Sequence, residues 1–328
     1  MTLEVLDVHK RYGGVVALDG VSLAFAPATY TCVMGASGSG KTTLLRALAG
    51  LEALDRGAIE LDGAAIDALP PERRPFHTVF QSYALFPHMT VAENVGFPAR
   101  LRGLAGAALR ERVAGLLADV GLDAAGLAER RPDALSGGQR QRVALARALA
   151  GEPRVVLLDE PLAALDRPLR AGLRRGLAAT QRARGLTFIH VTHDPEEAMA
   201  LADALVLLAE GRVLGVGAPA QLYARPPSEG AARLLGELSP LPGAEARWIR
   251  PERLAVATAT SAGAADLRRA AATLVVQRCL GDRWELELRA EGRALLARAA
   301  APVAAAAGAA LELRWSAADE LRFDAAPP

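Results

Sequence analysis

A glycine-rich run, GASGSGKT, follows the strand-like run TYTCVM and precedes the helix-like run TTLLRALA, which ends at Gly50. Glycines lack a Cβ, so they allow backbone N–H groups to curl around phosphate oxygens. Lys41 can reach the β- and γ-phosphate oxygens, and the Thr42 hydroxyl can ligate Mg²⁺. A chance Gly/Ser loop is the alternative, and the flanking strand and helix disfavour it. The sequence therefore predicts a phosphate-binding loop (P-loop) before a helix that Gly50 caps. The residues predicted to surround the nucleotide are Gly35, Ala36, Ser37, Gly38, Ser39, Gly40, Lys41, Thr42 and Thr43.

A second run, VVLLDE, reads as a buried strand that ends in two acids. The carboxyl ends of strands are where α/β proteins place ligands. Asp159 is predicted to hold Mg²⁺, directly or through water, and Glu160 to accept a proton from the attacking water. Taken alone, such a run is better explained by a strand that ends in a solvated acidic turn. The P-loop upstream favours the catalytic interpretation.

Short apolar runs alternate with helical patterns over the first two thirds of the chain. The runs TYTCVMG, RVVLLDE, LTFIHVTHD and DALVLLAEG each resemble a strand buried on both faces. Apolar residues recur at helical spacing from Leu109 to Val120. This alternation predicts an α/β domain with a mainly parallel sheet, which we place at residues 1–238, with a helical subdomain at about 91–150.

The character of the sequence changes after about Leu238. The run SPLPG is interpreted as a linker, and the runs RWELELRAEG and LELRW alternate apolar and polar residues as half-buried strands do. We therefore predict a small β-barrel-like domain at residues 239–328. The three tryptophans all lie here, and we expect them in its core rather than in a ligand cage: they are Trp248, Trp284 and Trp315.

The bulk composition excludes several classes of protein. The net charge of +1 gives no electrostatic footprint for nucleic acid, so no nucleic-acid partner is expected. Two cysteines, Cys32 and Cys279, cannot form a disulfide framework, and we expect both to be buried in a protein of a reducing compartment. We expect no secretory leader and no membrane span. Lys10 and Lys41 are the only lysines among 38 basic residues, so Lys41 is expected where a compact ammonium is needed.

The run LSGGQRQRVALARAL predicts a second anion-binding helix N-terminus. Ser136 and Gln139 have the spacing of a capping box, and Gly137 and Gly138 leave the backbone bare at the same helix start. One nucleotide site needs only one such cradle. A second cradle suggests a γ-phosphate bound between two chains.

At this point the sequence resembles the ABC ATPase family, in which LSGGQ is the signature motif. The resemblance implies an α/β P-loop NTPase cassette that forms a head-to-tail homodimer around two ATP molecules, each P-loop facing the partner's Ser136–Gln139. It also implies four roles. Tyr12 stacks on adenine, Gln81 senses Mg²⁺ and the attacking water, Asp166 belongs to a loop at the dimer interface, and His193 contacts the γ-phosphate.

Some of these residues also have ordinary interpretations, and the match has departures. Tyr12 alone reads as a surface aromatic and Gln81 as a polar loop residue; His190 is left in the core. The other histidines carry no role, and without a Cys/His cluster no zinc site is expected: His9, His77 and His88. Members of the family often have Pro at position 36, Ser at 163 and Gly-Glu at 28–29, where this chain has Ala36, Ala163, Ala28 and Thr29. None of these changes removes a phosphate or metal ligand.

The C-terminal run WIRPERL resembles the start of a TOBE domain, a small oligonucleotide-binding-like (OB-like) barrel found on importer ATPases. This implies permease partners in the inner membrane, a periplasmic or lipoprotein solute-binding protein acting indirectly, and a peripheral position on the cytoplasmic face. The run SYALFPHMTVAENV resembles the segment that contacts the permease. We expect an exposed patch of Tyr83, Leu85, Phe86 and Met89, with internal packing as the alternative. The run HTVFQSYALFPHMTV resembles spermidine/putrescine importers, and iron(III) or another small solute is the alternative.

Each of four rival functions disagrees with a feature of this sequence. A soluble ABC ATPase acting on ribosomes usually carries two cassettes, whereas this chain has one P-loop and one signature. A DNA-repair ATPase of the superfamily needs a long coiled-coil insertion between these motifs. An exporter subunit usually lacks the β-domain. A non-enzymatic relative would have lost Lys41 or Glu160, and both are present.

Overall fold

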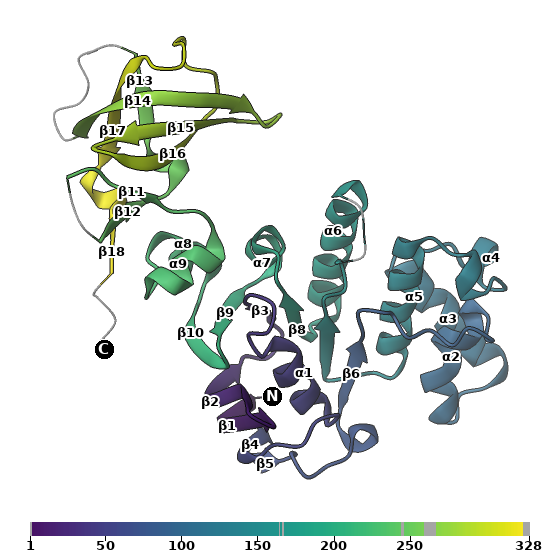
Figure 1. Cartoon of the computed structure of the whole chain (residues 1–328). Coiled ribbons are helices and arrows are strands. Elements are labelled where there is room, and N and C mark those ends of the chain that lie inside the picture. The colour runs from purple at the N-terminus through teal and green to yellow at the C-terminus, as the bar shows by residue number, and fades with distance from the viewer. Residues whose placement is uncertain (1, 164, 166, 244–245, 259–266, 324–328) are drawn as a thin grey trace. The chain divides into compact units, whose positions relative to one another are not determined.

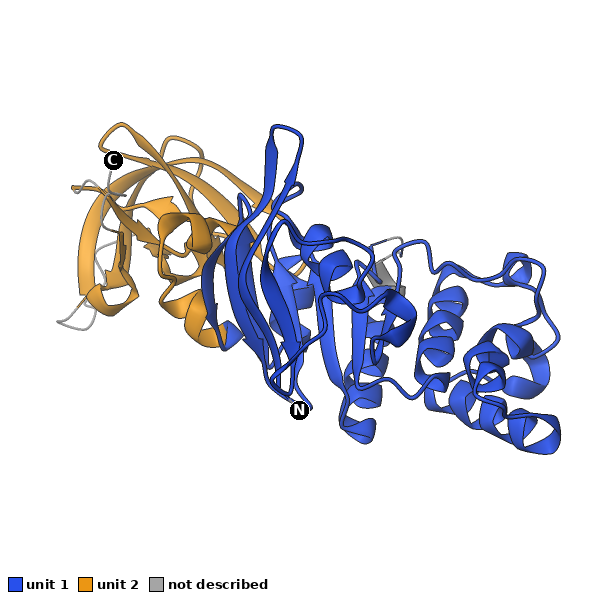
Figure 2. Cartoon of the chain, turned by 90° about the horizontal axis from the view of Figure 1, so that it is seen from below, with its two compact units in different colours: residues 1–219 blue, residues 220–328 orange. Residues whose placement is uncertain are grey.

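The computed structural model divides the chain into two compact units, residues 1–219 and 220–328, which Figure 2 colours separately. It describes residues 2–163, 165, 167–243, 246–258 and 267–323. The domain limits that we predict, 1–238 and 239–328, stay a prediction. Among the helices of the described ranges, none is long and apolar enough to cross a membrane.

A six-stranded sheet forms the centre of the first unit, in the order β10-β9-β3-β8-β7-β6. Neighbouring strands from β9 to β6 run parallel, and β10 is antiparallel to β9. Every residue of β3 and β8 is buried, as expected for strands covered on both faces. The predicted α/β sheet is therefore present. Its strands are β3 (Tyr30–Met34), β6 (Phe76–Val79), β7 (Val155–Asp159), β8 (Thr187–Thr192), β9 (Ala204–Ala209) and β10 (Arg212–Gly217).

A second sheet of the first unit is antiparallel and has the order β2-β1-β4-β5. Its apolar residues join those of helix α1 (Lys41–Ala49) and of the central sheet in one core, to which Ile59, Leu48 and Leu157 belong. The helix after the P-loop is thus packed in the main core. The strands of this second sheet are β1 (Leu3–Tyr12), β2 (Val15–Phe25), β4 (Arg56–Leu61) and β5 (Ala64–Ala65), and the short 3-10 turn η1 (Pro71–Arg73) follows.

Four helices between residues 91 and 150 pack on one another, α2 against α3 and α5, and α3 against α4 and α5. Figure 1 shows them as a group to one side of the sheet. The helix predicted from Leu109 to Val120 is α3, which turns Val113, Leu116 and Leu117 inward. The group contains α2 (Val91–Leu101), α3 (Gly106–Asp119), α4 (Ala124–Leu127), η2 (Pro132–Ala134) and α5 (Gly137–Ala150). Two further helices of this unit are α6 (Arg167–Arg184) and α7 (Pro195–Leu201).

The second unit contains two antiparallel sheets, β11-β12-β18 and β13-β17-β14-β15-β16. The outer strands β13 and β16 of the larger sheet also contact each other, so this sheet curls in the manner of a barrel. The predicted small all-β domain is present. The elements from residue 219 onward are α8 (Pro219–Ala224), α9 (Glu229–Leu235), β11 (Ser239–Pro240), β12 (Arg247–Ile249), η3 (Pro251–Arg253), β13 (Ala255–Ala257), β14 (Leu267–Cys279), β15 (Trp284–Ala290), β16 (Arg293–Ala299), β17 (Ala310–Ser316), η4 (Ala317–Asp319) and β18 (Leu321–Arg322).

Three expectations for the C-terminal region are wrong. The run at 239–243 is not a linker, because it begins with β11 and continues into Leu241, which is 1% exposed in the core. Trp315 and Trp284 belong to that core, but Trp248 lies outside it, under the guanidinium of Arg233 at 4.7 Å. Cys279 is exposed because it is the last residue of β14, next to the hairpin turn.

The buried histidine of β8 should make the protein acid-sensitive. His190 is fully buried, as expected, and its Nδ1 lies 2.9 Å from the hydroxyl oxygen of Tyr30. Burial lowers the pKa of His190 from 6.5 to about 3. Between pH 6.5 and 3 the imidazole of His190 therefore takes up a proton in the unfolded chain but not in the folded protein. The folded state is for this reason fully stabilised above pH 6.5 and loses stability as the pH falls towards 3.

We expect His190→Gln to remove this loss. In urea denaturation at pH 7.5, 6.5 and 5.5, followed by circular dichroism, the wild type should lose up to about 1.4 kcal/mol per pH unit more than the variant below pH 6.5. The matched control is His88→Gln, which changes an exposed histidine. Parallel pH profiles for the wild type and His190→Gln would contradict the prediction.

Candidate functional site

Strand register brings three predicted segments to one edge of the central sheet. Met34, at the end of β3, lies opposite Thr192 of β8. Asp159, at the end of β7, lies opposite Val191 of the same strand. The P-loop, the two acids and His193 directly follow these positions, so all of them start from the carboxyl edge of the sheet.

The P-loop approaches neighbouring backbone so closely that two of its positions admit only glycine. A Cβ on Gly35 would lie 2.1 Å from the carbonyl oxygen of Leu208, and one on Gly40 would lie 2.2 Å from that of Ala17. Gly40 also has a φ of 100°, and it is the N-cap of α1. The helix ends at Gly50, with a φ of 79°, as predicted. The glycines thus fix a tight curl at a helix N-terminus.

Lys41 points back into this curl. Its ammonium donates hydrogen bonds to the carbonyl oxygens of Gly35, at 2.9 Å, and Ala36, at 2.8 Å. The residue is 5% exposed. Burial lowers the pKa of Lys41, and the carboxylates of Glu160 and Asp159 oppose that shift. A cation therefore sits inside a loop of backbone amides, which is the arrangement that a polyphosphate needs.

Two of the three predicted metal ligands, Thr42 and Asp159, lie together. The Thr42 hydroxyl donates a long hydrogen bond of 3.4 Å to Oδ1 of Asp159. Burial raises the pKa of Asp159, against the hydrogen bond from Thr42. A hydroxyl and a carboxylate are oxygen donors of the kind that Mg²⁺ prefers. The donor set therefore fits a magnesium ion between α1 and the end of β7.

Glu160 and His193 form a pair at the same edge. Nδ1 of His193 lies 3.1 Å from Oε2 of Glu160. The backbone N–H of Glu160 donates to the carbonyl oxygen of Val191 at 3.0 Å, and its φ of 43° turns the chain out of the strand. The Glu160 side chain is 20% exposed and that of His193 is 56% exposed, so water can reach this pair.

Sequence reasoning missed the polar contacts that hold the turn at His193. The Thr192 hydroxyl accepts from the backbone N–H of Asp194 at 3.0 Å and donates to the carboxylate of Glu197. Glu197 is 5% exposed, and burial raises its pKa. Asp194 caps α7 ahead of Pro195, a pattern that could have been recognised. The buried Glu197 gives no such signal in the sequence.

Tyr12 lies near helix α1, since Thr43 of that helix influences its hydroxyl. Burial raises the pKa of the Tyr12 hydroxyl, Glu52 raises it further, and Thr43, the third residue of α1, opposes the shift. The ammonium of Lys10 lies 5.3 Å from the centre of the ring. Tyr12 is 44% exposed, so an aromatic surface remains open beside the P-loop helix.

The remaining predicted residues are not all brought to this edge. Gln81 is exposed in the turn after β6, where Val79 lies opposite Leu158 of β7, so it starts from the same edge. Ser136 and Gln139 form the predicted capping box, with Oε1 of Gln139 2.9 Å from the Ser136 nitrogen. This box, with Gly137 and Gly138, belongs to the group of α2 to α5 (Figure 1). Asp166 lies outside the described residues.

The predicted exposed patch after Gln81 is wrong for Tyr83, which is 6% exposed. The ring of Phe86 packs 5.0 Å from that of Phe97. Asn94 is fully buried and holds the loop, since its side chain accepts from the Phe86 nitrogen and donates to the carbonyl oxygens of Phe86 and Met89. Internal packing therefore explains much of this apolar run. Leu85, Phe86 and Met89 are half-buried.

The fold and this edge define a class of protein. The strands of the parallel sheet end at a P-loop, a Thr–Asp oxygen pair and a Glu–His pair. A protein with this arrangement is a P-loop nucleotide-binding protein. Family models narrow the class. Residues 18–163 match the ABC transporter family, and residues 248–323 match the TOBE domain.

Relatives and solved structures agree. The chain is 46% identical over 260 residues to the spermidine/putrescine import ATP-binding protein PotA of Pseudomonas fluorescens, covering 78% of this chain and 72% of that protein. It is also 46% identical over 237 residues to PotA of Nitrosomonas europaea, covering 72% and 65%. A dimeric bacterial ABC transporter cassette, MJ0796, superposes with a TM-score of 0.60 at 31% identity, covering 66% and 98%. The same cassette bound to ADP and Pi gives 0.60 at 30%, with the same coverage. The chain thus belongs to the ABC transporter family, as an ATP-binding cassette with ATPase machinery and a TOBE domain.

Substitution by alanine should lower the free energy of unfolding by different amounts at two glycines of the loop. Gly38→Ala places its Cβ in open space at a φ of 79°, so we expect only the strain of a left-handed residue, about 1–2 kcal/mol. Gly40→Ala adds the backbone clash with Ala17, so we expect about 1–3 kcal/mol more. Urea denaturation followed by circular dichroism compares the two variants, and equal losses would show that the loop relaxes around the Cβ at 40.

Proposed function

We propose that this chain is the ATP-hydrolysing subunit of an ABC importer for a small solute. The observation that carries the proposal is the pairing of Glu160 with His193, 3.1 Å apart, at the sheet edge that also carries the P-loop and Asp159. The TOBE-type domain and the importer names of the relatives support import. The protein then acts on the cytoplasmic face of the inner membrane as a peripheral subunit.

The residues around the P-loop bind the nucleotide. The amides of Gly35, Ala36, Ser37, Gly38, Ser39 and Gly40 surround the phosphates, with Thr43 and the ring of Tyr12 beside them. Lys41 neutralises charge on the β- and γ-phosphates. Thr42 and Asp159 would hold Mg²⁺, with Gln81 as a further oxygen ligand, and the ion would supply positive charge at the γ-phosphate.

Glu160 is the base that orients and deprotonates the attacking water. His193 fixes the Glu160 carboxylate through its Nδ1 and contacts the γ-phosphate, and Gln81 contacts the same water. The work of these residues is mainly positioning and charge stabilisation. Partial exposure of both side chains supports this role, since water must reach them.

A second copy of the chain completes each site. The N–H groups of Ser136 and Gln139 are engaged in the capping box, which leaves those of Gly137 and Gly138 to face a γ-phosphate. The four residues Ser136–Gln139 of the partner would therefore close over the nucleotide, and Asp166 would lie at the interface between the two copies. The dimeric cassettes among the similar structures support a homodimer.

The transported solute is proposed from the relatives alone. The names of the two relatives given above include spermidine and putrescine, so a polyamine is the first candidate and iron(III) or another small solute is the alternative. Selection would be made by permease subunits and by a periplasmic or lipoprotein solute-binding protein. We propose residues 1–238 as the ATPase domain, with 91–150 as its helical subdomain, and 239–328 as the TOBE-like domain.

Glu160→Gln should separate binding from turnover. The amide keeps the shape of the side chain but cannot accept the proton, so we expect ATP hydrolysis to fall by about 10²-fold or more with unchanged affinity for ATP. Phosphate release and fluorescent-nucleotide binding measure the two quantities. Glu196→Gln, an exposed acid three residues from His193, is the control and should match the wild type. Wild-type turnover in Glu160→Gln would overturn the assignment of the base.

The transport claim has a separate test. Tagged Glu160→Gln, expressed in its own cell type and extracted with detergent and ATP, should co-purify with a polytopic permease that mass spectrometry identifies. Cells lacking the gene should lose uptake of radiolabelled spermidine and regain it with the wild type but not with Glu160→Gln. Recovery only with ribosomes or in the soluble fraction would contradict transport. If the wild-type gene restored the uptake of iron(III) but not of spermidine, iron(III) would replace the polyamine as the proposed solute.

A further inference from the structure

A buried acid that the proposed machinery does not use is tied to the turn that carries His193. Glu197, the third residue of α7, is 5% exposed, and its carboxylate accepts a hydrogen bond from the hydroxyl of Thr192. Among the described residues, this is the one hydrogen bond that the carboxylate accepts. Burying a carboxylate with a single donor is unfavourable. The stability of the fold alone therefore gives no reason for an acid at this position.

The Thr192 hydroxyl lies between the two groups that an ordinary capping box would join. In such a box the side chain of the third helical residue accepts directly from the backbone N–H of the N-cap residue. Here the N-cap is Asp194, whose N–H donates to the Thr192 hydroxyl at 3.0 Å, and that hydroxyl donates to Glu197. The hydrogen bond from residue 194 back to the side chain of residue 192 closes a short backbone loop. His193 is the residue inside this loop.

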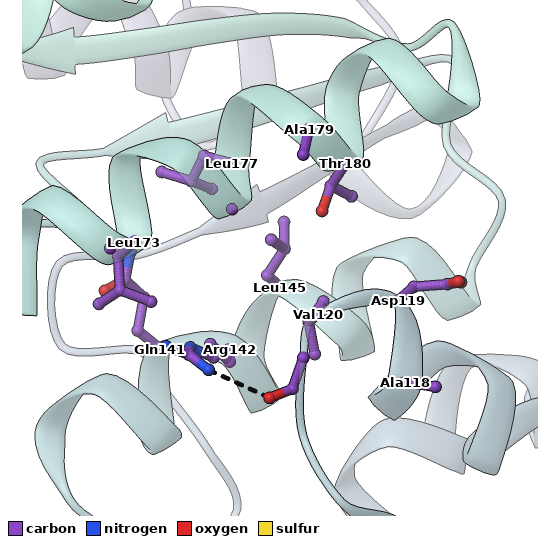
Figure 3. Close-up of a pocket in the computed structure, with 13 residues that line it drawn as sticks. Ala118, Asp119, Val120, Gln141, Arg142, Leu145, Leu173, Leu177, Ala179 and Thr180 are labelled. Carbon is purple, nitrogen blue, oxygen red and sulfur yellow. Dashed lines mark hydrogen bonds between the residues drawn. The ribbon is translucent and has the colours of Figure 1, made fainter.

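Helix α6 supplies positive charge to the same turn. Nη1 of Arg170 lies 3.5 Å from Oδ2 of Asp194. Burial raises the pKa of Glu197, and the charge of Arg170 opposes that rise. Further along α6, the buried Leu173 and Leu177 line a groove beside α5 (Figure 3). Their packing anchors the helix that carries Arg170.

The imidazole of His193 depends on this turn for its position. Its side chain is 56% exposed, and its Nδ1 lies 3.1 Å from Oε2 of Glu160. Because more than half of the side chain faces solvent, its place is set mainly by the backbone of the short loop. Loss of the Thr192 hydroxyl would release that backbone and let the imidazole move away from Glu160. A displacement of about 1 Å in a reacting group can lower a rate by about 10²-fold.

We propose that Thr192 and Glu197 are positioning residues, which hold the His193 imidazole at Glu160 by fixing the turn between β8 and α7. Glu197 orients the Thr192 hydroxyl, and that hydroxyl holds the backbone N–H of Asp194. This inference rests on the proposed function, because it requires His193 and Glu160 to take part in hydrolysis. It implies that loss of the Thr192 hydroxyl slows turnover and leaves the binding of ATP unchanged.

Substitution of Thr192 tests the proposal in the full-length chain. Valine keeps the shape of threonine but lacks the hydroxyl, so Thr192→Val should lower kcat for ATP hydrolysis about 10-fold or more and change KM less than about 2-fold. Thr192→Ser restores the hydroxyl and should return kcat to within about 3-fold of the wild type. Glu197→Leu should resemble Thr192→Val. Glu197→Gln should stay near the wild type, because its amide oxygen can still accept from Thr192.

Thr187→Val is the matched control. Thr187 is at the other end of β8 and is 2% exposed, and its hydroxyl accepts from the backbone N–H of Ala28 at 3.0 Å. Loss of either hydroxyl should lower the free energy of unfolding in urea, but only the loss at Thr192 should lower kcat. If Thr187→Val reduced kcat as much as Thr192→Val, turnover would simply follow stability and the proposal would be wrong.

A double-mutant cycle shows whether Thr192 acts through His193. In a His193→Ala background, Thr192→Val should lower kcat no further, because the positioned group is already missing. A second loss of similar size would contradict the proposal. Wild-type kcat in Thr192→Val beside a slow His193→Ala would overturn this inference alone. Wild-type kcat in His193→Ala would instead remove His193 from the proposed function.

The position of the imidazole can also be followed without turnover. The chain has five histidines, so the Cε1–H signal of His193 in a proton–carbon NMR spectrum can be assigned by its loss in His193→Ala. Thr192→Val should shift this signal, and Thr187→Val should not. Glu160→Gln should also shift it, and this shift should be smaller in the Thr192→Val background. An unshifted signal in Thr192→Val would refute the positioning role, whatever the rate of hydrolysis.

Discussion

The hydrogen-bonded register of β3, β7 and β8 is the constraint on which the candidate site depends. In this register Asp159 lies opposite Val191, and Met34 at the end of β3 lies opposite Thr192. Side chains of successive strand residues point to opposite faces, so a slip of one residue between β7 and its neighbour would exchange the surroundings of Asp159 and Glu160. In the observed register Asp159 faces Thr42, and Glu160 turns out of the strand towards His193. Two adjacent acids thereby acquire different partners.

Charge balance at this edge explains why a metal ion is part of the proposal. The positive charges of Lys41 and Arg46 lower the pKa of Asp159, and the negative charge of Glu160 raises it. These two cations roughly offset the two carboxylates, so the protein alone leaves little positive charge for a bound triphosphate. Burial already disfavours the charged forms of Lys41 and Asp159. A divalent cation beside Thr42 and Asp159 would supply the missing charge where the two oxygen donors meet.

Local patterns made the nucleotide edge predictable, whereas tertiary contacts decided the features that were missed. The P-loop, the Gly50 cap and the capping box at Ser136 each depend on residues close in sequence, and each forms as expected. Tyr83 is instead buried in a loop whose backbone Asn94 holds from α2. Leu241 enters the core because β11 pairs with β12, although its neighbours read as a linker. Neither contact has a signal in the local sequence.

The Ser136–Gln139 segment is stable without a ligand, and this has a mechanical consequence. Its capping box is internal, so α5 forms the same N-terminus whether or not a phosphate faces it. Ligand binding can then act on the position of the helix rather than on its folding. That position is set by the packing of α5 on α2, α3 and β6.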